Sequence, residues 1–204
     1  MASALSRDVF GAEPIVRAPS SVPYFTISRE APEDAAARES LLDLAMGPKR
    51  RRKASEALRR GRKPVSGLSL VARDGQGAVV GTVRLWHVAA GDDVTAALLL
   101  GPLAVAPHLS GAGIGSALMR RAIAEAQWQG HAAILLVGDP DYYERFGFSA
   151  EPAARLAMPG PFERHRLLAL ELKTASLSGA EGLIRATGDR MRTAAATTRV
   201  AMSA

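Results

Sequence analysis

The sequence predicts a single mixed α/β domain with a central, mostly antiparallel sheet flanked by helices. Short apolar runs bounded by turn residues alternate along the chain with segments of helical periodicity. The run at residues 133–137 is apolar throughout, as in a central strand that is covered on both faces. At 204 residues, of which 48% are hydrophobic, the chain is long enough for one substantial core.

The domain is expected to begin with one strand and two helices. Residues 24–28 alternate enough for a strand. Pro32 and the two acids after it form a helix start, because proline fits the first turn and acids favour its positive end. That helix should run to Met46, where a Gly-Pro pair ends it. A second helix is predicted over residues 51–60.

Three strands should follow. Residues 68–73 and 78–87 are joined by Asp-Gly-Gln-Gly, which is a hairpin-type turn. A further turn at residues 91–93 leads into a long strand that ends at Val105. Gly101-Pro102 interrupts this strand, and proline cannot donate to a ladder while glycine weakens one. We therefore expect a bulge, or a splay from the neighbouring strand, at this point.

The remaining elements complete the domain. The pattern predicts a helix over residues 113–129, a strand at residues 133–137, and a short helix that carries Tyr142 and Tyr143 on different faces. Residues 167–172 read as the last strand. We expect residues 1–21 to be a flexible segment, residues 22–174 to form the domain, and residues 175–204 to be a tail with at most one weak helix, over residues 180–192.

A glycine-rich loop dominates the functional reading. Residues 98–116 (LLLGPLAVAPHLSGAGIGS) combine a buried strand, a turn and a loop that opens a helix. Helix N-termini carry unpaired N–H groups and partial positive charge, and glycine lets a ligand lie against the backbone. The loop therefore predicts a phosphate site. A Walker loop is excluded because the lysine is missing, and a dinucleotide fingerprint fits poorly because Ser116 replaces its third glycine.

Two motifs resemble the GNAT acetyltransferase superfamily. Residues 103–118 (LAVAPHLSGAGIGSAL) are similar to its acetyl-CoA signature, a strand ending in L-x-V-x-P followed by Q/R-x-x-G-x-G/A and a helix. Residues 139–148 (DPDYYERFGF) resemble its Y-x-x-x-G-F element, in a form similar to one bacterial branch of uncharacterised members. Ser110 departs from the pattern, since its position is usually Gln or Arg. We expect weaker anchoring of the loop there.

The resemblance implies an acyl-CoA-dependent N-acyltransferase that moves an acetyl group from acetyl-CoA to an amine by direct attack in a ternary complex. Absence of cysteine excludes a cysteinyl acyl-enzyme. Tyr143 takes the role of proton donor to the departing thiolate; a half-buried packing tyrosine is the alternative. No metal is expected. The cofactor-binding residues implied are Leu103, Ala104, Val105, Gly111, Ala112, Gly113, Ile114, Gly115, Ser116 and Asp139, the last of which reads equally well as a helix N-cap.

The acceptor and the general base stay open. The sequence does not distinguish among a small amine, an antibiotic, a peptide and a protein lysine as the acceptor. Candidate bases are His87, Asp92, Asp93 and His108, although each is more simply a surface or turn residue. A catalytically idle acyl-CoA-binding sensor or scaffold is the alternative function.

Charge raises one further alternative. The net charge is +6, and much of it comes from a basic run in which only Glu56 is acidic: Lys49, Arg50, Arg51, Arg52, Lys53, Arg59, Arg60, Arg62 and Lys63. A solvated helical face is the simplest interpretation, and attraction of an acidic substrate or CoA is the next. A nucleic-acid-binding protein is the weakest, because no recognised module accompanies the run.

Three features that the sequence lacks bear on the cellular location of the protein. No apolar run approaches the roughly 20 residues that a membrane span needs. The first residues have no basic region followed by an apolar signal core, and cysteine is absent. We expect a cytoplasmic protein with no membrane contact. A homodimer stays open, because dimers are common in the superfamily.

Overall fold

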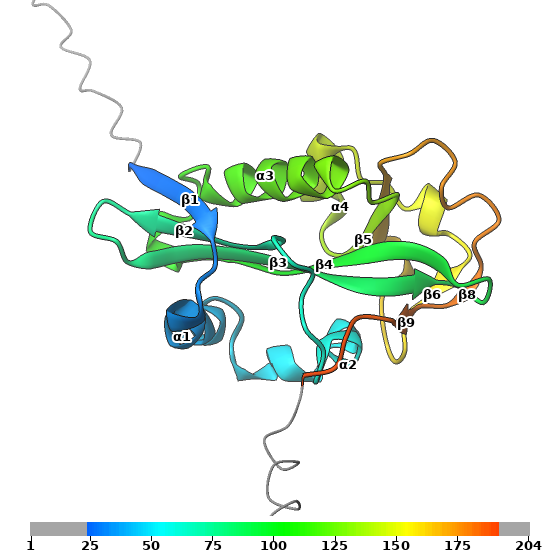
Figure 1. Ribbon diagram of the computed structural model, residues 1–204, viewed down its shortest axis with the longest axis horizontal. Helices are drawn as coiled ribbons and strands as arrows, with labels where there is room; N and C mark the ends of the chain where they lie inside the picture. The colour runs from blue at the N-terminus through cyan, green and yellow to red at the C-terminus, as the bar shows by residue number, and fades with distance from the viewer. Residues whose placement is uncertain (1–23, 192–204) are drawn as a thin grey trace, which may run out of the picture.

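The computed structural model describes residues 24–191, and its sheet confirms the predicted mixed, mostly antiparallel architecture (Figure 1). The main sheet has the order β1-β2-β3-β4-β5-β7, and β9 pairs with β3 beside this path. Neighbours β4 and β5 run parallel, whereas the other pairs are antiparallel. The strands are β1 (Phe25–Arg29), β2 (Ser69–Asp74), β3 (Val79–Ala90), β4 (Thr95–Val105), β5 (Ala133–Val137), β7 (Leu167–Glu171) and β9 (Arg185–Ala186), while β6 (Leu156–Ala157) and β8 (Gly182–Leu183) form a separate pair.

Helices cover both faces of the sheet. Helix α3 (Ile114–Trp128) lies on one face, and α1 (Ala35–Met46) and α2 (Ala54–Arg59) lie on the other (Figure 1). Among the described residues, no helix has the length and apolar character needed to cross a bilayer. The remaining helical segments are short: α4 (Pro140–Tyr143), η1 (Pro32–Asp34), η2 (Pro48–Arg52), η3 (Pro107–Leu109), η4 (Glu144–Phe146), η5 (Glu151–Ala153) and η6 (Arg164–Arg166).

Alternation along the strands divides the core into two clusters. In β4, Leu98 belongs to the cluster that contains the buried stripe of α3, whereas Leu99 belongs to the cluster that contains Leu58 of α2 and Trp86. Successive strand residues point to opposite faces, so one strand supplies both clusters. Each fully buried aliphatic side chain contributes about 1.5–3 kcal/mol. Because β4 is fixed by packing on both faces, it is a rigid support for the loop that follows it.

The predicted interruption of β4 is confirmed. Gly101 and Pro102 stand opposite one residue of β3, Arg84, which is the two-against-one count of a bulge. The parallel pairing between β4 and β5 ends at Leu99 opposite Leu135. Beyond that pair the two strands diverge, and β4 continues beside β3 alone. This divergence, called the splay below, opens the sheet between the ends of β4 and β5.

The chain after residue 174 differs from the prediction. The weak helix expected over residues 180–192 is wrong across the part that the structure describes, because this segment contains β8 and β9. Gly182 has a φ of +95°, which a right-handed helix does not allow. Ile184 is fully buried in the second core cluster, so packing against the sheet decides the conformation. The segment expected to be flexible, residues 1–21, lies outside the described residues.

Candidate functional site

The glycine loop presents its backbone. Gly111 and Gly113 have φ angles of +83° and +81°, a region that glycine enters without steric cost. A Cβ at either position would meet no heavy atom within 4 Å, so this side of the loop is open. Gly113 is the N-cap of α3, and no side chain of the described region caps it. The N–H groups of the first turn therefore remain free for an anion.

The residues around this loop differ in how far they are buried. Ile114 is 1% exposed and packs in the core, so of this predicted cofactor residue only the backbone is left for a ligand. Ala104 is buried as well, while Leu103, Val105, Ala112 and Ser116 are half-buried and Gly111 and Gly113 are exposed. The predicted residues of β4 and of the loop thus lie in one segment, residues 103–116, in which exposed glycines follow the half-buried end of β4.

Asp139 supports the short helix α4 through its backbone. Its carbonyl oxygen accepts hydrogen bonds from the N–H groups of Tyr142 and Tyr143, each at 3.1 Å. Its carboxylate is exposed and does not cap the helix within the described region. The side-chain N-cap considered from the sequence is therefore not formed. Asp139 nevertheless fixes the backbone of both tyrosines.

Tyr143 is held at the end of β5. Its ring lies directly over the backbone of Gly138, where a Cβ would collide with it, and it meets Phe148 edge-on at 6.0 Å. Burial raises the pKa of Tyr143 to about 12; Tyr142 adds to this shift and Arg166 opposes it. The phenol is therefore protonated throughout the neutral range. A proton donor needs this state.

Tyr142 packs against the glycine loop. Its ring is nearly perpendicular to that of Tyr143, at 87° and 4.9 Å. A Cβ on Gly115 would lie 2.8 Å from the Tyr142 hydroxyl oxygen, so the absence of a side chain there lets α3 and α4 approach. The predicted difference in direction between the two tyrosines agrees with this geometry.

A small cavity of about 80 Å³ opens at the splay, large enough for a reacting group. We call it the splay cavity. Tyr143 lines it together with the β4 bulge, so this residue faces the gap between the diverging strands. The full lining besides Tyr143 comes from α1, η2, α2, β4 and the end of β5, with Lys53 between η2 and α2: Met46, Arg50, Lys53, Ser55, Glu56, Arg59, Leu100, Gly101, Pro102, Leu103, Leu136 and Val137.

A second cavity adjoins the first and is rich in guanidinium groups. We call it the arginine cavity. It shares Arg50, Glu56, Arg59 and Pro102 with the splay cavity, so the two hollows are adjacent. Its remaining lining is Glu39, Leu42, Arg51, Arg60, Arg84 and Trp86.

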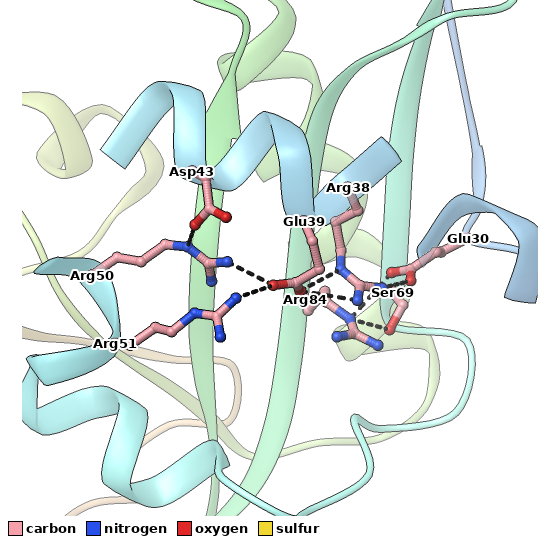
Figure 2. A network of polar contacts seen from close by, with 8 residues as sticks. All are labelled: Glu30, Arg38, Glu39, Asp43, Arg50, Arg51, Ser69 and Arg84. Atoms are coloured by element: carbon pink, nitrogen blue, oxygen red, sulfur yellow. Dashed lines mark hydrogen bonds and ion pairs between the residues drawn. The ribbon is translucent and has the colours of Figure 1, made fainter. Parts of the chain in front are cut away.

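Figure 2 shows the ion-pair network beside these cavities. Arg50 donates to Asp43 at 2.7 Å and to Glu39 at 2.6 Å, which ties η2 to α1. Glu39 also pairs with Arg38, and Arg38 pairs with Glu30. The network reaches the sheet where Arg84 of β3 meets Glu30 at 3.1 Å. Side-chain pairs therefore hold α1 and η2 in place against the sheet.

Sequence reasoning missed the importance of the basic run. Arg50 and Arg59 are each only 8% exposed, so for these two residues a solvated helical face is wrong. The helix predicted over residues 51–60 divides instead into η2 and α2, because Lys53 is extended between them. Glu56, as the single acid in the run, was the available signal.

The four candidate bases lie elsewhere. His87 packs beside His131, with ring centroids 5.6 Å apart, in a different hollow. Asp92 pairs with Arg185 at 2.6 Å. Neither these residues nor Asp93 and His108 line the splay cavity or the arginine cavity. In residues 24–191, no cluster of three or more metal-ligating side chains occurs.

Comparison with known proteins agrees with this geometry. A family model described as an acetyltransferase (GNAT) domain matches residues 66–150. The uncharacterized N-acetyltransferase YhbS of Escherichia coli K12 is 33% identical over 122 residues, which cover 57% of this chain and 70% of YhbS. The crystal structure of Escherichia coli YhbS in complex with CoA has a TM-score of 0.68 at 29% identity, covering 81% of this chain and 91% of that one. A GNAT family acetyltransferase from Brucella melitensis in complex with acetyl-CoA has a TM-score of 0.57 at 28% identity, covering 84% and 97%.

Proposed function

The chain belongs to the GNAT acetyltransferase family, and we propose that it transfers an acetyl group from acetyl-CoA to an amine by direct attack in a ternary complex. One observation carries the proposal most strongly. Tyr143, a phenol whose pKa is raised to about 12, lines the cavity at which β4 and β5 diverge. A proton donor thus faces the gap where the unpaired edge of β4 is free to bind a ligand.

In this proposal the backbone holds acetyl-CoA. The N–H groups of Gly111 and of residues 113–116 bind the pyrophosphate, because they lie at the uncapped N-terminus of α3, whereas the N–H of Ala112 already donates to the carbonyl of Leu109. The edge of β4 from Leu103 to Val105 pairs with the amide groups of the pantetheine arm. The CoA and acetyl-CoA bound in the Escherichia coli and Brucella melitensis structures support this choice of ligand.

Tyr143 then serves the departing sulfur. As the neutral amine attacks the thioester carbon, the C–N bond forms and the C–S bond breaks. The thiolate takes the phenolic proton of Tyr143, and the phenolate recovers a proton from the acylated nitrogen. A pKa of about 12 makes that phenolate a strong base, so the recovery is favourable. Tyr143 is therefore protonated again at the end of each catalytic cycle.

Calorimetric titration with acetyl-CoA tests the proposal, with desulfo-CoA as a thiol-free control. We expect a dissociation constant in the micromolar range. Thiol release should then depend on both acetyl-CoA and an added amine. Binding without thiol release for any amine would support the idle acyl-CoA-binding alternative. Absence of binding would contradict the proposal at its first step.

A further inference from the structure

Of the two arginines that line both cavities, Arg50 belongs to the ion-pair network of Figure 2 and Arg59 does not. Arg59 is 8% exposed, and it lines both the splay cavity and the arginine cavity. One terminal nitrogen contacts Glu56 at 3.1 Å and Ser55 at 3.4 Å. The Nε atom is buried, and it has no hydrogen-bond partner among residues 24–191. Buried polar groups normally have partners, so this donor is available to an acceptor atom of a bound molecule.

The position of Arg59 relates it to the reaction centre. Its Nη1 atom would lie 3.1 Å from a Cβ on Gly101, so the guanidinium sits against the bulge of β4. The bulge marks the start of the splay, and Tyr143 lines the same cavity. A group bound by Arg59 is therefore next to the position proposed for the thioester.

The charges around Arg59 favour an anion. Burial lowers the pKa of Arg59, Glu56 opposes this shift, and Arg50 and Arg84 add to it. Burial also lowers the pKa of Arg84, with Glu30 opposing and Arg38 adding to the shift. Partly desolvated cations that repel one another are stabilised when an anion joins them. Guanidinium groups suit planar or tetrahedral oxyanions in particular, because they donate in pairs.

We propose that the acceptor is a zwitterion, an amine with a carboxylate or phosphate group a few bonds from its nitrogen, and that Arg59 binds this anionic group while Glu56 faces the amine. The 3.1 Å contact between Glu56 and Arg59 sets the spacing, because neighbouring opposite charges fit a compact molecule that carries both. This inference rests on the proposed function and names its substrate class.

The phosphates of CoA do not account for this cavity in the proposed arrangement. Their proposed site is the N-terminus of α3, which lies on one face of the sheet (Figure 1). Helices α1 and α2, with the arginine cavity between them and the sheet, lie on the opposite face. The molecule thus offers two separate places for anions, and the second belongs to the acceptor.

The fluorescence of Trp86 can report anion binding in the arginine cavity. It lines the arginine cavity, and the guanidinium of Arg84 lies 5.1 Å from its ring centre. The only other tryptophan of the chain is Trp128, which is 81% exposed, so Trp128→Phe leaves Trp86 as the only indole. Sodium acetate and inorganic phosphate are titrated into this variant at constant ionic strength. We expect a saturable fluorescence change, and the anion that binds more tightly distinguishes carboxylate from phosphate.

Two substitutions in the basic run complete the titration. Adding Arg59→Met should weaken anion binding at least about tenfold, which corresponds to the roughly 1.4 kcal/mol of a charge-assisted hydrogen bond. Adding Arg52→Met removes the same charge from outside both cavities and should change binding less than about twofold. If circular dichroism shows that Arg59→Met does not fold, Arg59→Lys is used in its place. It keeps the charge but removes the paired donors of the guanidinium group, and it should still weaken binding several-fold. No saturable change, or equal binding after Arg59→Met, would overturn the proposal.

Acetyl transfer provides the second arm. Thiol release is compared for β-alanine against β-alaninamide, and for phosphoethanolamine against ethanolamine. At least one anionic member should exceed its neutral partner about tenfold in kcat/KM, and Arg59→Met should remove that preference. A preference for the neutral members would overturn the zwitterion assignment. The anion titration needs no catalysis, so its result is separate from failure of acetyl transfer itself.

Discussion

On the α3 side of the sheet the chain offers backbone, and on the side of α1 and α2 it offers charged side chains. The loop that opens α3 contributes N–H groups, two glycines with positive φ and little side-chain material. The arginine cavity is lined by five guanidinium groups and two carboxylates, several of which are tied into the network of Figure 2. The properties of the α3 side therefore depend on backbone conformation, whereas those of the α1 and α2 side depend on the identity of the side chains.

The difference separates two kinds of recognition within one fold. A backbone site tolerates changes in neighbouring side chains, but it fails when a glycine that requires positive φ is replaced. A side-chain site can change its ligand through single substitutions while the fold is kept. The two sides meet at the splay, where the end of β5 places Tyr143. Substitutions on each side, and at their meeting point, should thus have separable effects.

The largest effect is expected at the meeting point. Tyr143→Phe removes the phenolic proton while keeping the ring that packs over Gly138. We expect kcat to fall at least about 100-fold, the low end for loss of a general acid. The dissociation constant for acetyl-CoA should change less than about threefold, because backbone groups hold that ligand in the proposed arrangement. Thiol release and calorimetry measure the two quantities.

Tyr24→Phe is the control for this change, because Tyr24 is exposed at the edge strand β1 and takes no part in either cavity. Its kcat should equal that of the unchanged protein. If Tyr143→Phe also kept full turnover, Tyr143 would be a packing residue and the proton would come from elsewhere.

Gly113→Asp should come next, and it should act on the cofactor side alone. A residue other than glycine at φ +81° costs about 1–2 kcal/mol, and a carboxylate here would repel phosphate. We expect acetyl-CoA binding to weaken at least about tenfold by calorimetry. Gly130→Asp is a matched control at the other end of α3, with φ +80° and equally open space. It should lose stability without losing affinity, and equal loss of affinity in both variants would refute a site at the loop.

The same contrast explains what the sequence could predict. The cofactor side lies in one continuous run, so its strand, bulge, glycine loop and helix were readable from spacing between Leu98 and Ser116. Strand β5 was predicted at its observed bounds, because a continuously apolar run has few other interpretations. Local chemistry was sufficient wherever the ligand groups are local.

The acceptor side was not readable in this way. Glu39, Arg59 and Arg84 come from α1, α2 and β3, and Glu30 comes from the connection after β1, so only the folded sheet brings them together. A charge run is usually solvated, and apart from the single acid Glu56 nothing local distinguished the buried Arg59 from the exposed Arg52. The helix predicted over residues 180–192 was wrong for a related reason. Contact with β3 and with the second core cluster overrides the helix propensity of this segment.

The smallest effect is expected in the ion-pair network. Burial alone would raise the pKa of Glu39, but hydrogen bonds from Arg50 and Arg38 outweigh it and lower the pKa below 4.5. A carboxylate with a depressed folded-state pKa stabilises the protein above its unfolded pKa, and that contribution is lost as pH falls through the folded value. Its side chain is 41% exposed, so solvent limits the contribution to about 1 kcal/mol or less. Glu39→Gln should lower the free energy of unfolding by this amount at pH 7 and by less at pH 3, because the contribution is lost as the pH falls through the lowered pKa.

Urea unfolding of both proteins at the two pH values measures this difference, with the exposed Glu33→Gln as the control that should show no change at either pH. Glu39→Gln also leaves Arg50, which lines both cavities, with Asp43 as its remaining carboxylate partner in this network, so KM for the acceptor should rise several-fold. Acetyl-CoA affinity should stay within about twofold, because the glycine loop lies on the other face of the sheet. A loss of acetyl-CoA affinity equal to the rise in KM would mean that the two sides are coupled, and the separation between backbone and side-chain recognition would then fail.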